Sequence, residues 1–273
     1  MGQRSRDHRP CPPGTARRLI LAACAAFALF AFAASTASAD PIEGVWSFNG
    51  GRVAIKADGD GTLSGIVVSP TKFDECVHEV GEEVWSQITP QVDGSYQGLH
   101  RWFTTDGNCD PVSTLGHTAW RVISDSHGSR FLRVCFSSPG STAQPQIDND
   151  GEHADTTYGC VDSQRIAGLP QSTFRSYTRL PPNTACIRRP RLRIHIHDRA
   201  NDPLKQVRVT LHSHGVRRAA KIKRRRKGIL ATLNLRRLAN GPFTVTVRLT
   251  TVLDEHFFGR RTYSLCRPTK HRS

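Results

Sequence analysis

The stretch GILATLNLRRLANGPFTVTVRLT, residues 228–250, alternates apolar and polar residues on both sides of a turn-forming sequence. Its apolar positions are Ile229, Ala231, Leu233 and Leu235 before the turn, and Phe243, Val245, Val247 and Leu249 after it. Because successive strand side chains point to opposite faces, this pattern predicts antiparallel strands with one buried face. Residues 192–197 and 207–212 alternate in the same way. Six or seven such strands within residues 186–273 predict a β-sandwich.

Part of this stretch also resembles a known family. Leu238, Gly241, Phe243, Val245 and Val247 are similar to the strand motif L-x-x-G-x-aromatic-x-V-x-V of bacterial immunoglobulin-like domains. The resemblance covers residues 186–266 and implies an immunoglobulin-like β-sandwich. Such domains occur in exported and surface proteins as spacers or binding modules, so the resemblance implies binding or structure rather than catalysis.

The preceding part of the chain also consists of short strand-like segments. Residues 44–70, GVWSFNGGRVAIKADGDGTLSGIVVSP, predict three strands separated by turns at Asn49-Gly50 and at residues 58–61. About eight such segments without helical periodicity predict an antiparallel barrel or sandwich. The opening Gly44-Val45-Trp46 is similar to the start of lipocalin-like barrels. That resemblance implies that Trp46 plugs one end of a barrel whose lumen could hold a small apolar ligand.

The N-terminus has the organisation of an export signal. Residues 1–39 combine a basic start, an apolar run from Leu19 to Ala34 and the sequence Ala37-Ser38-Ala39. These features predict a signal peptide cleaved before Asp40, hence a secreted or cell-surface, extracytoplasmic protein. The alternative is an uncleaved anchor, but the apolar run is shorter than the roughly 20 residues of a spanning helix. No membrane span is therefore expected after cleavage.

The cysteines support the same compartment. Six follow the signal peptide: Cys76, Cys109, Cys135, Cys160, Cys186 and Cys266. An even number in an exported chain predicts three disulfides, although the sequence alone permits about 15 connectivities. Sequential pairing is favoured, because Cys135 and Cys160 lie in two strand-like segments and the last two cysteines bracket one strand-rich region. Metal binding or thiol catalysis is the alternative, but no C-x-x-C occurs.

Charge divides the chain into two parts. Residues 40–185 contain 10 Lys and Arg against 18 Asp and Glu, whereas residues 186–273 contain 23 against 4. This asymmetry predicts an acidic β domain over 40–165, a linker over 166–185, and a basic immunoglobulin-like domain over 186–273.

The densest basic run is KIKRRRKG, residues 221–228. Residues 224–227 are predicted to form a hairpin tip, with Gly228 at positive φ. A solvated tip is one interpretation and contact with an anionic polymer is the other. The candidate polyanion-binding residues are Lys221, Lys223, Arg224, Arg225, Arg226 and Lys227. Outside the cytoplasm, anionic envelope polymers, acidic lipid headgroups, acidic glycans or the acidic half of the same chain are the expected partners, and nucleic acid is not.

Three further sets of residues could carry chemistry. His195 and His197, with His212 and His214, suggest a metal site. If the two segments pair as a hairpin with Ile196 opposite Val207, His195 lies beside Arg208, which argues against a metal; if the segments belong to different sheets, this objection lapses. Acidic residues in glycine-containing loops suggest calcium but lack the spacing of a helix-loop-helix site: Asp58, Asp60, Asp148, Asn149, Asp150, Glu152 and Asp155. Aromatic residues could form a sugar platform, although core positions are favoured: Trp46, Trp85, Tyr96, Trp102 and Trp120.

No nucleophile elbow, zinc-protease motif or phosphate loop occurs in the chain. The sequence therefore predicts an exported, non-enzymatic binding or structural protein of the cell envelope, without a cofactor, whose basic domain contacts anionic polymers. One alternative is a carrier of a small apolar ligand in the N-terminal barrel. The other is a secreted glycan hydrolase with a carboxylate pair that only the fold brings together.

Overall fold

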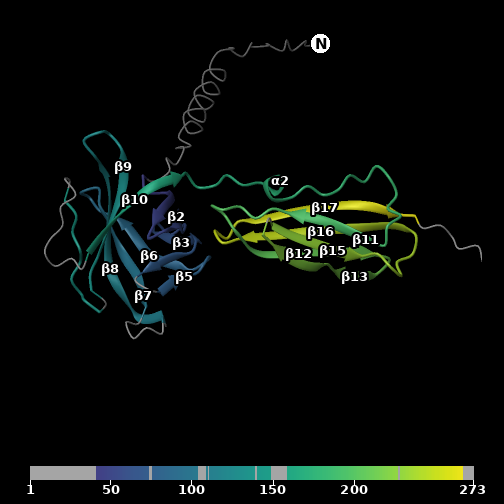
Figure 1. Cartoon of the computed structure of the whole chain (residues 1–273), viewed down its shortest axis with the longest axis horizontal. Coiled ribbons are helices and arrows are strands. Elements are labelled where there is room, and N and C mark those ends of the chain that lie inside the picture. The colour runs from purple at the N-terminus through teal and green to yellow at the C-terminus, as the bar shows by residue number, and fades with distance from the viewer. Residues whose placement is uncertain are drawn as a thin grey trace, which may run out of the picture. The chain divides into compact units, whose positions relative to one another are not determined.

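The computed structural model describes residues 41–73, 76–103, 109, 111–138, 140–148, 159–226 and 228–266. Within these ranges the chain is all-β apart from one short helix, α2 (Phe174–Tyr177), so the predicted fold class is confirmed. The strands form a closed barrel between residues 44 and 167, and two larger sheets between residues 191 and 265. Figure 1 traces the barrel from purple to teal and the later sheets from green to yellow.

The barrel contains eight antiparallel strands, which are joined in chain order and closed by pairing of the first with the last. They are β1 (Gly44–Phe48), β2 (Gly51–Ala57), β3 (Leu63–Ser69), β6 (Glu83–Pro90), β7 (Tyr96–Phe103), β8 (Pro111–Ser124), β9 (Arg130–Phe136) and β10 (Gly159–Ala167). A small hairpin of β4 (Thr71–Phe73) and β5 (Cys76–His78) interrupts this order. Closure leaves the barrel without an edge strand, which removes a route to aggregation.

Aromatic side chains fill the barrel core. The Trp85 ring contacts Phe48 and Trp120 edge to face, with ring centroids 4.9 Å and 5.7 Å apart. Its side chain lies over Gly65, where an added Cβ would lie 2.5 Å from Trp85 Cε3. The four tryptophans and Tyr96 are all at most 6% exposed, so they form core and not a sugar platform. Burial of these apolar side chains stabilises the barrel.

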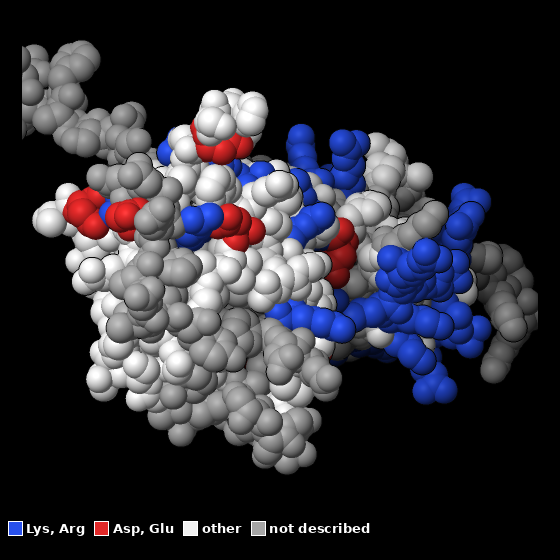
Figure 2. Space-filling view, turned by 60° about the vertical axis from the view of Figure 1, so that its left-hand side comes forward, with Lys and Arg blue, Asp and Glu red and all other residues white. Residues whose placement is uncertain are grey.

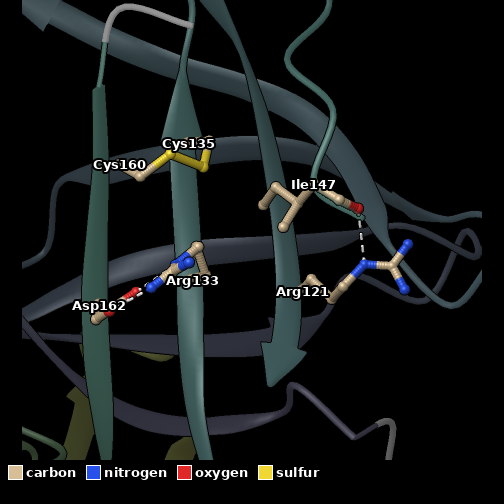
Figure 3. Close-up of a disulfide and its surroundings, with 6 residues drawn as sticks. All are labelled: Arg121, Arg133, Cys135, Ile147, Cys160 and Asp162. Atoms are coloured by element: carbon tan, nitrogen blue, oxygen red, sulfur yellow. Dashed lines mark hydrogen bonds and ion pairs between the residues drawn. A yellow bond between two sulfur atoms is a disulfide. The ribbon is translucent and has the colours of Figure 1, made fainter. Parts of the chain in front are cut away.

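The outer face of the last barrel strands is held by covalent and polar links (Figure 3). Cys135 of β9 and Cys160 of β10 are directly opposite and form a disulfide. Two residues away from the disulfide on each strand, Arg133 of β9 donates from Nε to Asp162 Oδ1 of β10 at 2.7 Å. Arg121 of β8 donates from Nε to the Ile147 carbonyl at 2.8 Å, and Ile147 packs against the buried Cys135. These contacts hold the segment around Ile147 against the barrel wall.

The later sheets share one apolar core and form a β-sandwich. One sheet has the order β11 (Arg191–Ile196), β15 (Gly228–Asn234), β14 (Lys221–Arg225). The other has the order β13 (Val216–Ala219), β12 (Leu204–Ser213), β16 (Gly241–Thr251), β17 (His256–Leu265). The apolar positions of β15 and β16 are buried, which confirms the predicted alternation.

Of the two strand arrangements that the sequence left open, the structure has the one with the segments in different sheets. The segments at 192–197 and 207–212 do not form a hairpin, because β11 pairs with β15 and β12 pairs with β16. Asp202 lies in the connection between β11 and β12 and is fully buried, where its carboxylate accepts hydrogen bonds from Tyr177 and Ser172. This anchored corner carries the chain from one sheet to the other. The apolar faces of the two segments therefore line opposite sides of the core.

All six described cysteines pair with their neighbours in the chain, as the sequence favoured: Cys76–Cys109, Cys135–Cys160 and Cys186–Cys266. Three intramolecular disulfides fit an oxidising, extracytoplasmic environment. Within the described ranges, no helix has both the length and the apolar character needed to cross a membrane.

Candidate anion-binding surfaces

The basic run lies mostly in a strand and not in a hairpin tip. Arg224 and Arg225 belong to β14 and pair with Ile229 and Gly228, which corrects the predicted connection over 224–227. Backbone pairing with β15 is independent of side-chain charge, so the strand continues through the arginines. Gly228 has a φ of 125°, as expected for the end of the turn. Lys227 lies outside the described residues.

Most cations of this run face solvent. Every residue of β14 is exposed. Among the described cations of the run, Arg224 alone is engaged, since its guanidinium donates to the Leu204 carbonyl at 2.9 Å and lies 3.4 Å from Asp198 Oδ2. The side chains of Lys221, Lys223, Arg225 and Arg226 make no ion pair with any described residue. Because β14 is an edge strand, its charges also oppose pairing with a strand of another molecule.

A second cationic surface covers the outer face of the four-stranded sheet. Arg208 of β12 lies directly opposite Arg248 of β16, which in turn lies opposite Phe258 of β17. One step along, Thr210 and Thr246 are opposite each other and are followed by Arg260. The next step places Arg217, His212, Thr244 and Thr262 side by side. None of the four strands contains an aspartate or a glutamate.

The arginines of this face have no anionic or hydrogen-bonding partner in the part of the chain that the structure describes. Arg208, Arg217, Arg248 and Arg260 form no ion pair and no side-chain hydrogen bond there, and the guanidinium of Arg248 lies 6.0 Å from the centre of the Phe258 ring. Together with three threonines, these side chains line a groove of about 450 Å³. In Figure 2, Lys and Arg side chains gather in one region of the surface, and few Asp or Glu side chains lie among them.

The sequence contains a signal for this face, because Arg208, Arg217 and Arg260 extend the basic field of the domain, but it does not show that they meet on one sheet. Arginine, threonine and histidine recur at every second position of β12 and β16, between the buried apolar residues. Their alignment across strands depends on the register, which the sequence does not reveal.

The other predicted ligand sets do not assemble. His195 and His212 lie in strands of different sheets, so the two H-x-H pairs do not converge. Within the described residues, no three His, Cys, Asp or Glu side chains are placed to hold a metal ion. Asp60 accepts hydrogen bonds from Thr62, and Asp58 accepts one from Ser64, so both serve a hairpin turn. Of the second acidic loop, Asp148 is described, whereas Asn149, Asp150, Glu152 and Asp155 lie outside the described residues.

Two buried histidines, one from β5 and one from the barrel strand β7, form a polar cluster. His78 and His100 are fully buried, with ring centroids 5.8 Å apart, and His78 Nδ1 lies 3.0 Å from Glu82 Oε1. Burial lowers the pKa of His78, although the hydrogen bond with Glu82 opposes this shift. Burial, with a smaller contribution from His78, lowers the pKa of His100 well below its ordinary value. Both groups are therefore held neutral in the folded barrel.

Acidification is expected to destabilise the barrel through these histidines. Their folded-state pKa values lie below the unfolded value of about 6.5, so the unfolded chain binds protons that the folded chain does not. The stabilising contribution of the neutral histidines is therefore fully present above this pH, and the free energy of unfolding should decline as the pH falls from 7.5 to 5. Denaturant titrations followed by tryptophan fluorescence report on the barrel, which holds all four tryptophans. The variant His100→Leu should show a shallower decline, and an unchanged pH dependence would contradict this assignment.

No protein-family model matches the chain, and no curated protein matches it.

Proposed function

We propose that the chain is an exported, non-enzymatic binding or structural protein of the cell envelope, whose C-terminal domain contacts anionic polymers. The observation that carries the proposal is charge: residues 186–273 contain 23 Lys and Arg against 4 Asp and Glu. Two ion pairs, Lys205–Asp254 and Arg224–Asp198, engage few of these cations among the described residues. Uncompensated charge of this size attracts polyanions without requiring a particular sequence in the partner.

The order of the strands supports an immunoglobulin-like sandwich. In that fold, strands B, E and D share one sheet, and strands C, F and G share the other, to which some members add C′. The order β11-β15-β14 corresponds to B-E-D, and β13-β12-β16-β17 corresponds to C′-C-F-G. The segment before β11 pairs with both sheets: Thr178 forms an antiparallel bridge with Ile196 of β11, and Ile187 forms a parallel bridge with Leu265 of β17. A first strand divided between the two sheets would pair in this way. This architecture suits a spacer or binding module.

The features of the barrel favour a lipocalin-like architecture more than they favour a carrier function. It has the eight up-and-down strands of that class. Trp46 is buried, donates from Nε1 to the Ile42 carbonyl at 2.8 Å, and is covered by the Arg165 guanidinium. However, the core positions are occupied by large aromatic rings, so we assign the barrel a structural or presenting role. Export would follow from the N-terminal signal, with the acidic and basic domains divided at residues 166–185.

Salt dependence provides the test of this function. We expect the full chain to bind isolated cell envelope, and to lose about 100-fold in affinity between 50 and 200 mM salt, because binding releases counterions. Quantitative pull-down across the salt series, with duplex DNA and a neutral polysaccharide as comparators, measures this. The variant Lys221→Gln/Lys223→Gln/Arg225→Gln/Arg226→Gln should weaken binding and flatten the salt slope. Absence of envelope binding at 50 mM salt would mean that the positive charge acts within the chain and would reject the proposal.

A further inference from the structure

The outer face of the four-stranded sheet has a charge arrangement that folding alone does not favour. Like charges directly opposite on neighbouring strands are destabilising, and Arg208 faces Arg248 with no carboxylate on any of the four strands. Arg260 and Arg217 add further positive charge to the same groove. A guanidinium presents several donors in a fixed fork, which suits bidentate binding of an external anion.

The groove continues beyond the arginine pair in both directions along the strands. A depression of about 370 Å³ lies on one side of Arg208 and Arg248 and is also lined by Thr250 and His256. Another of about 350 Å³ begins at His212 and Thr244 and extends to His214. The part of β12 from Gln206 to Ser213 spans roughly 23 Å at the usual rise per residue. A surface of this length fits an extended polymer rather than a small anion.

The remaining side chains favour a polymer of sugar rings. Phe258 is 58% exposed and shares a cross-strand row with Arg208 and Arg248. An exposed aromatic face beside a cationic group can pack against an apolar ring face while the cation binds its substituent. Thr210, Thr244 and Thr246 supply hydroxyl groups that both donate and accept hydrogen bonds. A polyphosphate offers no ring for Phe258.

We propose that this groove binds an extended acidic polysaccharide, with its carboxylate or sulfate groups on Arg208 and Arg248 and a sugar ring against Phe258. The inference rests on the proposed function, since it names the class of anionic polymer and the site on the sandwich that selects it. The basic β14 strand then contributes general attraction, whereas the groove contributes selectivity.

The test compares four probes of matched charge number on the full chain: a polyuronate, its sulfated counterpart, polyphosphate and polyglutamate. Arg208→Gln/Arg248→Gln should weaken both glycans about 100-fold, because each charge-assisted contact is worth roughly tenfold in affinity. The matched comparison is Lys223→Gln/Arg225→Gln, which removes the same charge from β14 and should weaken all four probes alike, by about threefold, because these cations contribute general attraction. Phe258→Ala should weaken the glycans about tenfold and leave polyphosphate and polyglutamate unchanged.

Each outcome has a separate meaning. The groove variant should unfold at a temperature no lower than the native chain, because it removes a repulsive pair, so lost binding would not reflect misfolding. If both charge variants weaken all four probes equally, or if Phe258→Ala weakens none, the groove is not a glycan site and only the proposed function remains. Selective loss of polyphosphate or polyglutamate would assign the groove to that polymer and overturn the inference. If the native chain binds none of the probes at low salt, the proposed function fails with it.

Discussion

Replacing Cys186 and Cys266 together by alanine is expected to lower the free energy of unfolding of the sandwich by about 4.5 kcal/mol. The disulfide joins residues 80 positions apart, at the two ends of the strand-rich region. Cross-linking such a long loop removes many conformations from the unfolded chain, and the folded chain loses few. Because Ile187 already bonds with Ser264 and Cys266 through the backbone, the ends should stay together in the folded variant at low temperature.

The two parts of the chain can be followed separately. Tryptophan fluorescence reports on the barrel, since no tryptophan lies beyond residue 120, whereas hydrogen exchange of β12 and β16 amides reports on the sandwich. The control Cys135→Ala/Cys160→Ala opens a loop of 25 residues in the barrel and should cost about 3.5 kcal/mol there. Unchanged exchange in β12 and β16 after loss of Cys186–Cys266 would contradict the prediction.

Strand alternation was predictable from the sequence, whereas sheet membership was not. Leu192, Ile194 and Ile196 predict a strand because every second residue is apolar, and they are buried as expected. Their partner depended on the following connection, Asn201-Asp202-Pro203, which is compatible both with a hairpin and with a crossing between sheets. The crossing is stabilised by burial of Asp202 against Tyr177, a contact between residues 25 positions apart. Local sequence patterns do not predict such a contact.

The candidate sites show the same limit. A run of cations predicts an exposed surface, and β14 is exposed, but its extended backbone follows from pairing with β15. The pairing of Arg208 with Arg248 joins residues 40 positions apart and depends on a bulged register in β12. In the barrel, nothing in the sequence around Gly65 indicates that this residue accommodates the Trp85 ring. Chemistry that depends on cross-strand neighbours becomes visible only when the register is known.

Replacing Trp85 by alanine is expected to lower the free energy of unfolding of the barrel by about 3–5 kcal/mol. The ring is fully buried among Phe48, Trp120 and the Gly65 backbone, so removing it loses apolar burial and leaves a cavity. Gly65 and its strand are fixed by pairing on both sides, which limits collapse of the barrel into this space. The exposed Phe258→Ala is the matched control and should change stability by less than about 0.5 kcal/mol.

This variant also tests whether the native barrel is a carrier. A dry cavity of this kind binds a small apolar molecule, so added indole should raise the unfolding temperature of Trp85→Ala by preferential binding to the folded state. Indole should not raise the unfolding temperature of the native chain, because Trp85 already occupies that volume. Thermal unfolding of both chains across an indole series, followed by circular dichroism, measures the difference. Stabilisation of the native chain by indole would show an accessible lumen and favour the carrier function over the structural role assigned to the barrel.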